Sequence, residues 1–123
     1  AEHNQYWYSA NTIECMLSEA LDAGGRGAYV STPSVYFSLP KSKRVGSHVF
    51  DIDTQWDKDP GFVRYDFNEP EAIPKELHHA FDFVLVDPPF ITREVWEKYA
   101  VTVKLLAKEG SAARVVVAGD AAS

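Results

Sequence analysis

The chain has 123 residues, 12 of them Lys or Arg and 18 Asp or Glu, so its formal net charge is −6 at neutral pH. This length fits one domain and leaves little room for two independent cores. The acidic balance argues against a protein that coats nucleic acid, because such proteins carry clustered Lys and Arg. The single cysteine, Cys15, excludes an internal disulfide, and no apolar run approaches the roughly 20 residues that span a bilayer. The composition therefore predicts a cytoplasmic protein without a membrane segment.

The first predicted element is a helix over residues 9–24. Its apolar residues recur at the i, i+3, i+4 and i+7 spacing of one helical face: Ile13, Met16, Leu17, Ala20 and Leu21. Gly24 and Gly25 then favour a helix end, because glycine readily adopts the left-handed conformation found at C-caps.

Five short apolar runs follow, at residues 28–30, 48–52, 61–67, 81–86 and 114–118. The last two are nearly continuous in Val, Leu and Phe, which is typical of strands buried on both faces of a parallel sheet. A second helix is predicted between them with Thr92 as its N-cap, whereas Pro40 limits an earlier connection to a short helix or loop. The alternation predicts an open, mostly parallel α/β sheet whose ligands bind at the carboxyl ends of the strands.

The most informative motif is Asp87-Pro88-Pro89-Phe90, which directly follows the apolar run at residues 81–86. Prolines fix φ and lack N–H groups, so Asp87 and a nearby backbone carbonyl can both accept hydrogen bonds from one amino group. Phe90 offers a flat face to a cation or a planar base. The motif predicts a site that aims an amine's lone pair at an electrophile. The alternative is a rigid turn that ends a strand.

Asp87-Pro88-Pro89-Phe90 resembles the Asp/Asn-Pro-Pro-aromatic motif of class I S-adenosylmethionine-dependent methyltransferases that modify amino groups. Further motifs recur in the order seen in one eukaryotic family: Gln5-Tyr6-Trp7-Tyr8-Ser9, Ser31-Thr32-Pro33-Ser34-Val35-Tyr36, Phe50-Asp51-Ile52-Asp53 and Tyr65-Asp66-Phe67-Asn68-Glu69-Pro70. The chain is thus similar, from about residue 4 to residue 118, to the elongation factor 1-alpha lysine methyltransferases, first described as adenine-specific DNA methyltransferase-like. The resemblance implies a Rossmann-like sheet, S-adenosylmethionine as cofactor and elongation factor 1-alpha as substrate.

The resemblance also implies roles for residues after the first two strands. Ser31, Thr32 and Pro33 stand where most such enzymes carry a Gly-x-Gly loop, and their small side chains leave room for the methionine part of the cofactor. Asp51 and Asp53 follow the second strand, where an acid typically accepts hydrogen bonds from the ribose hydroxyls. Asp53 is the first choice because it is expected nearer the strand end.

Two further groups complete the implied cofactor site. Asp66 is expected to end the third strand and to contact the adenine amino group, with Tyr65 or Phe67 beside the ring. Two of the acids at positions 51, 53 and 66 are expected to be functional. Residues ahead of the first helix are expected to cover the methionine end of the cofactor: Gln5, Trp7 and Tyr8. Core packing is the alternative for Trp7.

Three functions remain open. A protein lysine would be drawn to the acids at positions 53, 66, 69 and 87, and water or Asp87 could relay its proton. An adenine amino group would need a flipped base stacked on Phe90 and a cationic surface, yet the chain's basic cluster is confined to residues 41–44. The charge makes nucleic acid an improbable partner. A catalytically inactive binding scaffold is the third alternative, favoured by the missing Gly-rich loop and opposed by the intact motif.

We expect residues 1–123 to form one methyltransferase core domain. Residues 1–27 would be an N-terminal arm and helix, and residues 28–118 the cofactor-binding sheet. Relatives continue with further strands, so the C-terminal part of the fold is expected to be missing. No metal site is expected, because His78 and His79 lack partners at ligand spacing.

Overall fold

The computed structural model of the chain describes residues 10–88, 92–109 and 113–117. Its centre is a five-stranded sheet in the order β3-β2-β1-β4-β5, with every neighbouring pair parallel. The strands are β1 (Gly27–Val30), β2 (His48–Asp51), β3 (Phe62–Arg64), β4 (Phe83–Val86) and β5 (Arg114–Val117). The chain runs outward from β1 in one direction and then from β4 in the other, so the order reverses between these two strands. The predicted open α/β fold is confirmed.

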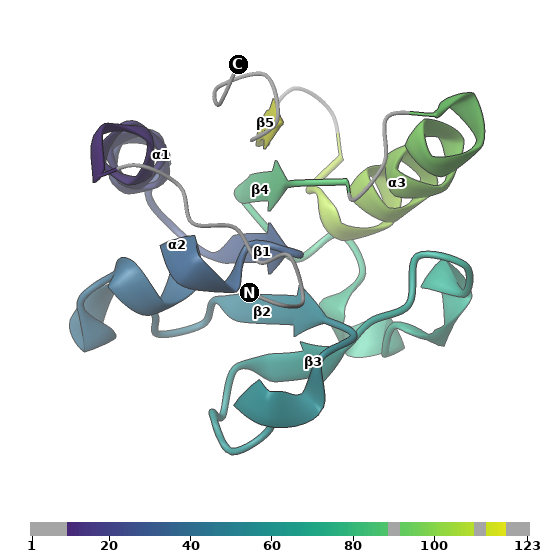
Figure 1. Cartoon of the computed structure of the whole chain (residues 1–123), viewed down its shortest axis with the longest axis horizontal. Coiled ribbons are helices and arrows are strands. Elements are labelled where there is room, and N and C mark those ends of the chain that lie inside the picture. Colours follow the sequence, from purple (N-terminus) through teal and green to yellow (C-terminus); the bar gives the residue numbers. More distant parts are fainter. Residues whose placement is uncertain (1–9, 89–91, 110–112, 118–123) are drawn as a thin grey trace.

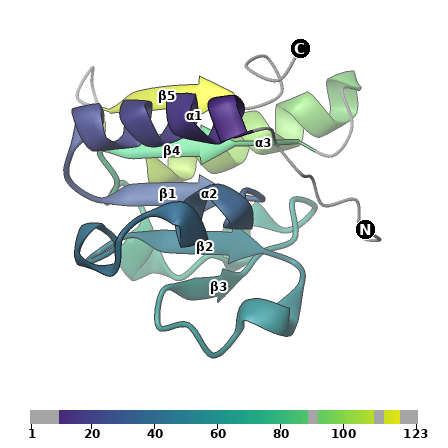
Figure 2. The same ribbon diagram turned by 60° about the vertical axis from the view of Figure 1, so that its left-hand side comes forward.

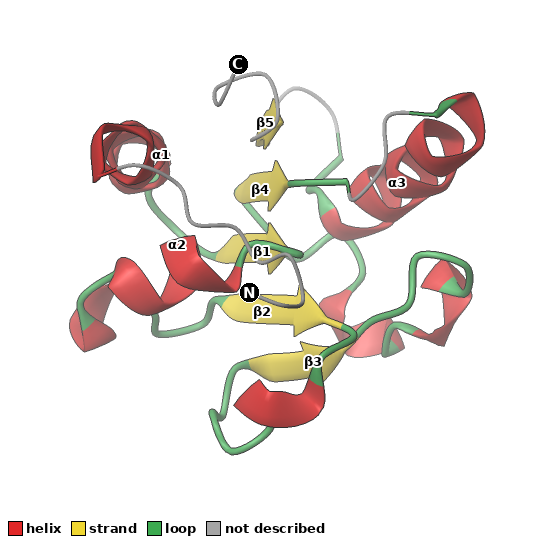
Figure 3. Cartoon of the chain, in the orientation of Figure 1, coloured by secondary structure: helices red, strands yellow, loops and turns green. Residues whose placement is uncertain are grey.

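Helices cover both faces of this sheet (Figure 1, Figure 3). The helices are α1 (Ala10–Ala23), α2 (Pro33–Ser38) and α3 (Arg93–Leu106). Figure 2 shows α1 and α2 together on one face, with α3 behind the sheet on the other. Short 3-10 helices at Pro70–Ala72 and Lys75–Leu77 share the face of α3. Within the described ranges, none of the helices has the length and apolarity needed to cross a membrane.

Side-chain alternation along the strands explains the two-sided core. In β1, Tyr29 packs in the cluster beneath α1 and α2, whereas Ala28 and Val30 pack in the cluster beneath α3. Successive side chains of a strand point to opposite faces, so one four-residue strand contributes to both cores. All residues of β1 and β4 are buried, which for β4 confirms the prediction from its continuous apolar run. The same prediction for the run at residues 114–118 is wrong, because β5 lies at the edge of the sheet and its residues are exposed or half-buried.

The helix boundaries follow local chemistry. Thr92 is the N-cap of α3, and its hydroxyl accepts a 3.3 Å hydrogen bond from the backbone N–H of Val95, which confirms that prediction. Pro33 stands at the start of α2, where its missing N–H costs nothing. The short helix ends before Pro40, as expected from the restraint that proline imposes.

The third strand is shorter than its apolar run predicted. The run covers residues 61–67, but β3 ends at Arg64. Beyond it the Asp66 carboxylate accepts a 2.9 Å hydrogen bond from the backbone N–H of Asn68, which bends the chain into a turn. The expectation that Asp66 ends the strand is therefore wrong, because its side chain stabilises a turn just past the end.

Candidate functional site

The carboxyl ends of β1, β2 and β4 bring three predicted site residues to one edge of the sheet. Val30 is in register with Phe50 on one side and with Val86 on the other. The residues that follow these three are Ser31, Asp51 and Asp87. Backbone hydrogen bonds continue the alignment, since the Ser31 N–H donates to the Phe50 carbonyl at 2.7 Å and the Asp87 N–H donates to the Val30 carbonyl at 3.2 Å. The site therefore lies where the strand order reverses, the usual ligand position in open α/β sheets.

The turn after β1 is held in an uncommon backbone conformation. Ser31 has φ +62°, in the left-handed region that favours glycine. Its hydroxyl lies 3.0 Å from the hydroxyl of Tyr99 on α3, a side chain only 2% exposed. Burial raises the pKa of Tyr99, so this phenol stays protonated and can donate to Ser31. The charges of Asp51 and Asp87 also act to raise that pKa.

Thr32 contributes a buried hydroxyl to the same turn. Its backbone carbonyl accepts hydrogen bonds from the N–H groups of Val35 and Tyr36 and so begins α2. Its side chain is 1% exposed, yet Oγ1 has no hydrogen-bond partner among the described residues. Leaving a buried hydroxyl without a partner costs about 1–3 kcal/mol. This unsatisfied group beside Ser31 suits a turn that contacts a polar ligand.

Asp51 and Asp53 have different surroundings, although only one residue separates them. Asp51 is the last residue of β2, is 8% exposed, and accepts a 2.9 Å hydrogen bond from the Asp53 N–H. Asp53 begins the 3-10 helix Thr54–Trp56, and both of its carboxylate oxygens accept from Gln55, one from the backbone and one from the side chain. The expectation that Asp53 lies nearer the strand end is thus corrected, because β2 ends at Asp51.

Phe67 and Pro88 are two further predicted site residues that the structure describes. The Phe67 ring lies 5.5 Å from the Tyr99 ring, and the Lys98 ammonium lies 5.7 Å from its centroid. Phe67 therefore belongs to the α3 side of the site. Asp87 and Pro88 directly follow β4. Asp87 is half-buried and Pro88 is buried.

Five predicted residues lie outside the part of the chain that the structure describes: Gln5, Trp7, Tyr8, Pro89 and Phe90. Their expected positions around the cofactor and the amine stay predictions. Among the described residues, no group of three or more His, Cys, Asp or Glu side chains is arranged to hold a metal ion.

Comparison with known proteins identifies the family. A family model described as "Probable N6-adenine methyltransferase" matches residues 1–122 of the chain. The chain belongs to this family. With its sheet of five parallel strands, this member of the N6-adenine methyltransferase family has the Rossmann-like arrangement that its motifs predicted.

Curated relatives carry more particular names. "EEF1A lysine methyltransferase 1" of Bos taurus is 38% identical over 112 residues, covering 85% of this chain and 50% of the relative. The Gallus gallus protein of the same name is also 38% identical and is covered over 53% of its length. "Protein-lysine N-methyltransferase EFM5" of Saccharomyces cerevisiae is 30% identical over 114 residues, which cover 84% of this chain and 46% of the relative. The predicted resemblance to elongation factor 1-alpha lysine methyltransferases is confirmed.

The chain spans about half the length of the curated relatives that it matches. No solved structure matches it significantly. The positions of Ser31, Asp51 and Asp87 in this member of the N6-adenine methyltransferase family therefore come from the structure of this chain alone. The structure also brings Tyr99 into contact with Ser31. The sequence did not predict this contact, because the position of Tyr99 in α3 indicates only core packing.

Proposed function

We propose that the protein is an S-adenosylmethionine-dependent protein-lysine N-methyltransferase that acts on elongation factor 1-alpha in the cytoplasm. The observation that carries the proposal is the alignment of Ser31, Asp51 and Asp87 at the strand reversal, in a chain of a methyltransferase family. The names of its relatives support a lysine as the acceptor. The single cysteine agrees with a reducing compartment.

The strand ends offer groups that suit each part of S-adenosylmethionine. This cofactor supplies a methyl group on a positively charged sulfur. Asp51 is proposed to accept from its ribose hydroxyls, since this carboxylate is buried at the end of β2, next to the strand reversal, whereas Asp53 lies beyond the strand at the start of a 3-10 helix. Thr32 Oγ1 provides a hydroxyl that has no partner among the described residues, and Phe67 an aromatic face for the adenine.

The remaining expected contacts complete this proposal. Pro33 is buried at the start of α2 and shapes the turn beside the methionine part. One carboxylate oxygen of Asp66 accepts a hydrogen bond from the Asn68 N–H, and the second oxygen would accept one from the adenine amino group. The N-terminal arm would cover the methionine end: Gln5, Trp7 and Tyr8.

Asp87 is the proposed amine-binding residue. Its carboxylate and the backbone carbonyl at Pro88 accept hydrogen bonds from the lysine nitrogen and fix the direction of the lone pair, while Pro89 and Phe90 would complete the wall. A lysine ammonium must first lose a proton, which passes to Asp87 or to water. With S-adenosylmethionine bound, Asp87 and the Pro88 carbonyl would hold this nitrogen in line with the methyl group, which would pass to the nitrogen and leave the sulfur as a neutral thioether. Positioning of the nucleophile supplies most of the rate enhancement.

An adenine amino group in DNA or RNA is the second candidate, and the printed description of the family favours it. Asp87 could accept the same hydrogen bonds from that amino group and so orient it, with the base resting on Phe90. The net charge of −6 opposes this candidate, since nucleic acid must be held by cations. An inactive scaffold is the third candidate.

One parallel assay separates the three. The full-length protein is incubated with labelled S-adenosylmethionine and, separately, with elongation factor 1-alpha, DNA or RNA. We expect label in the elongation factor, on lysine, and none in either nucleic acid. Label confined to nucleic acid would refute the lysine assignment. Absence of any heat when the cofactor is titrated calorimetrically would leave only the scaffold.

Asp87→Ala tests the proposed amine site. Turnover should fall about 100-fold or more, since loss of a group that orients the amine and accepts its proton has effects of this order. The calorimetric affinity for the cofactor should stay close to that of the wild type. Asp57→Ala, which changes an exposed acid in the turn after β2, is the matched control and should retain full turnover. Normal turnover by Asp87→Ala would overturn the assignment.

A further inference from the structure

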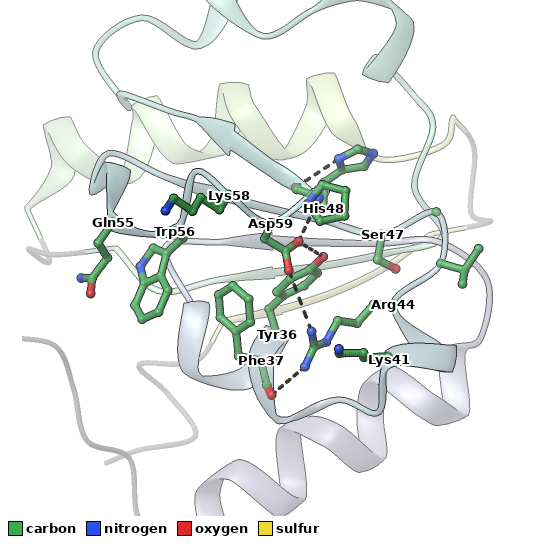
Figure 4. A pocket seen from close by; sticks show the side chains of 14 residues that line it. Tyr36, Phe37, Lys41, Arg44, Ser47, His48, Gln55, Trp56, Lys58 and Asp59 are labelled. Carbon is green, nitrogen blue, oxygen red and sulfur yellow. Dashed lines mark hydrogen bonds and ion pairs between the residues drawn. The ribbon is translucent and has the colours of Figure 1, made fainter.

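A pocket of about 630 Å³ lies beside the β2–β3 edge of the sheet, on the face of α2 (Figure 4). Its lining comprises residues 36–37, 44–48 and 58–61, together with Lys41, Gln55 and Trp56. We call it the β2–β3 pocket. Ser31, Asp51 and Asp87 do not line it, so it is separate from the proposed cofactor and amine sites. Its volume falls within the range of about 300–1,000 Å³ that is usual for ligand pockets.

The connection between β2 and β3 explains why this space is open. The connection contains only the 3-10 helix Thr54–Trp56, followed by turns, and no long crossover helix. In Figure 2, α1 lies over the β4–β5 side of the sheet and α2 over its centre. The outer part of this face is therefore covered only by short loops, and a hollow remains between them and α2.

Aromatic rings form the floor of the pocket. The Phe37 and Trp56 rings lie 4.9 Å apart at an angle of 34°. Tyr36 meets Phe37 edge to face at 4.9 Å. The Arg44 guanidinium lies over the rings of Tyr36 and Phe37, at 5.4 and 5.3 Å. These contacts give the pocket an apolar surface made of large, well-packed groups.

Hydrogen bonds fix this floor in place. Arg44 donates to the backbone carbonyls of Leu39 and Phe37, at 3.1 and 2.9 Å. Its guanidinium also lies 3.9 Å from the Asp59 carboxylate, which accepts a 3.0 Å hydrogen bond from the Tyr36 hydroxyl. Arg44 and Asp59 thus neutralise each other, and neither has a full charge left for a ligand. A lining held in this way loses little side-chain entropy when it binds.

Two lysines supply the net charge of the pocket. Lys41 and Lys58 are both exposed and form no ion pair with another described residue. Figure 4 shows Lys58 on the side of Trp56 and Lys41 on the side of Arg44. In a protein with a net charge of −6, this pocket therefore combines an apolar floor with two exposed lysines at its rim. Charge complementarity selects an acidic ligand.

We propose that the β2–β3 pocket binds an acidic segment of a partner protein, which inserts an apolar side chain between Lys41 and Lys58. The apolar floor accounts for the inserted side chain and the lysines for the flanking carboxylates. A polynucleotide fits less well, because two lysines cannot follow a phosphate backbone that the rest of the chain repels. Phe37 and Trp56 also face each other, so each ring has one face fewer for a base to stack on.

Fluorescence anisotropy with defined peptides tests this proposal on the full-length protein. The probe is a labelled peptide that carries four glutamates on each side of a central tryptophan. A second peptide has alanine at its centre, and a labelled single-stranded oligonucleotide is the nucleic-acid probe. We expect the tryptophan peptide to bind, the alanine peptide to bind about tenfold more weakly because the apolar contact is lost, and the oligonucleotide to bind more weakly than either.

Charge reversal identifies the surface. Lys41→Glu with Lys58→Glu should weaken binding of the tryptophan peptide by about tenfold at low salt, with a smaller difference at high salt. Lys75→Glu with Lys104→Glu, two exposed lysines on the α3 face, is the matched control and should leave binding unchanged. Both double variants should unfold like the wild type, because the four side chains are exposed.

Three results would overturn the proposal. One is equal affinity of the peptide for the Lys41→Glu, Lys58→Glu variant and the wild type. Another is failure of the tryptophan peptide to bind at millimolar concentration. The third is tighter binding of the oligonucleotide than of the peptide, with loss of that binding in the Lys41→Glu, Lys58→Glu variant. None of these outcomes depends on methyl transfer.

Discussion

Ser31 shows how the turn after β1, in the proposed cofactor site, adopts a left-handed conformation without glycine. A non-glycine residue at φ +62° costs of order 1 kcal/mol, so its surroundings must hold it there. Its N–H is bonded to Phe50 in β2, and its hydroxyl to Tyr99 in α3. Two neighbouring elements thus fix a conformation that glycine would adopt by itself. We infer that Tyr99 is a positioning residue for the turn.

Tyr99→Phe removes the hydroxyl that holds Ser31 and keeps the ring. The cofactor dissociation constant should rise about fivefold, as expected from one hydrogen bond of about 1 kcal/mol, while turnover at saturating cofactor is retained. Calorimetric titration and steady-state kinetics measure the two quantities. Tyr36→Phe is the matched control, because it removes a 3.0 Å hydroxyl contact with Asp59 in the core on the other face of the sheet and should leave cofactor affinity unchanged.

Tyr99→Phe is also measured in a Ser31→Gly background, which shows whether Tyr99 acts by holding Ser31 or by packing in the core. Glycine needs no support in the left-handed region, so Tyr99→Phe should change cofactor affinity less than twofold in that background. A fivefold loss in both backgrounds would mean that Tyr99 acts through the core and not through Ser31.

At the scale of elements, much of the structure follows from local sequence. The apolar runs placed all five strands, and Thr92 marked the start of α3. The sequence did not predict where side chains form hydrogen bonds with backbone N–H groups in place of the hydrogen bonds between strands. Asp53 and Asp66 bond nearby backbone N–H groups, so β2 and β3 end before their apolar runs do. Such hydrogen bonds depend on the local conformation of the backbone, so a pattern of apolar residues does not predict them.

His48, the first residue of β2, makes stability depend on pH. Its ring packs edge-on against Phe81 at 5.9 Å, and Nδ1 lies 3.2 Å from the Gly61 carbonyl. Burial lowers the pKa of His48 in the folded protein. Its contribution to stability is therefore full above the unfolded-state pKa of about 6.5 and is lost as the pH falls below it, because the unfolded chain then binds the proton more tightly.

His48→Gln should flatten this dependence. Denaturant unfolding at pH 7.5 and at pH 5.5 gives the change in free energy of unfolding for the variant and for the wild type. We expect the wild type to lose more stability than His48→Gln over this interval. An identical loss in the two proteins would show that His48 is not the group that titrates.

For the whole molecule, the sequence predicted the sheet and the acids at its carboxyl edge, since alternating elements and a motif after a strand are visible in a linear pattern. Asp51 and Asp87 could be assigned to that edge without coordinates. The β2–β3 pocket could not be predicted. Its lysines and aromatic rings come from α2 and two separate loops, and the basic run at residues 41–44 gave no sign of Phe37 or Trp56 beside it. The acids and this basic pocket thus lie in different parts of the molecule.

The central claim is that the acid at the end of β2 holds the methyl donor at the strand reversal. Calorimetric titration of S-adenosylmethionine into Asp51→Ala and Asp53→Ala tests it most directly, because the two acids are close in sequence and differ in their surroundings. We predict that Asp51→Ala weakens binding about 10- to 100-fold, as expected for a charged hydrogen bond, and that Asp53→Ala changes it less than threefold. Equal losses in the two variants, or wild-type affinity in Asp51→Ala, would contradict the account.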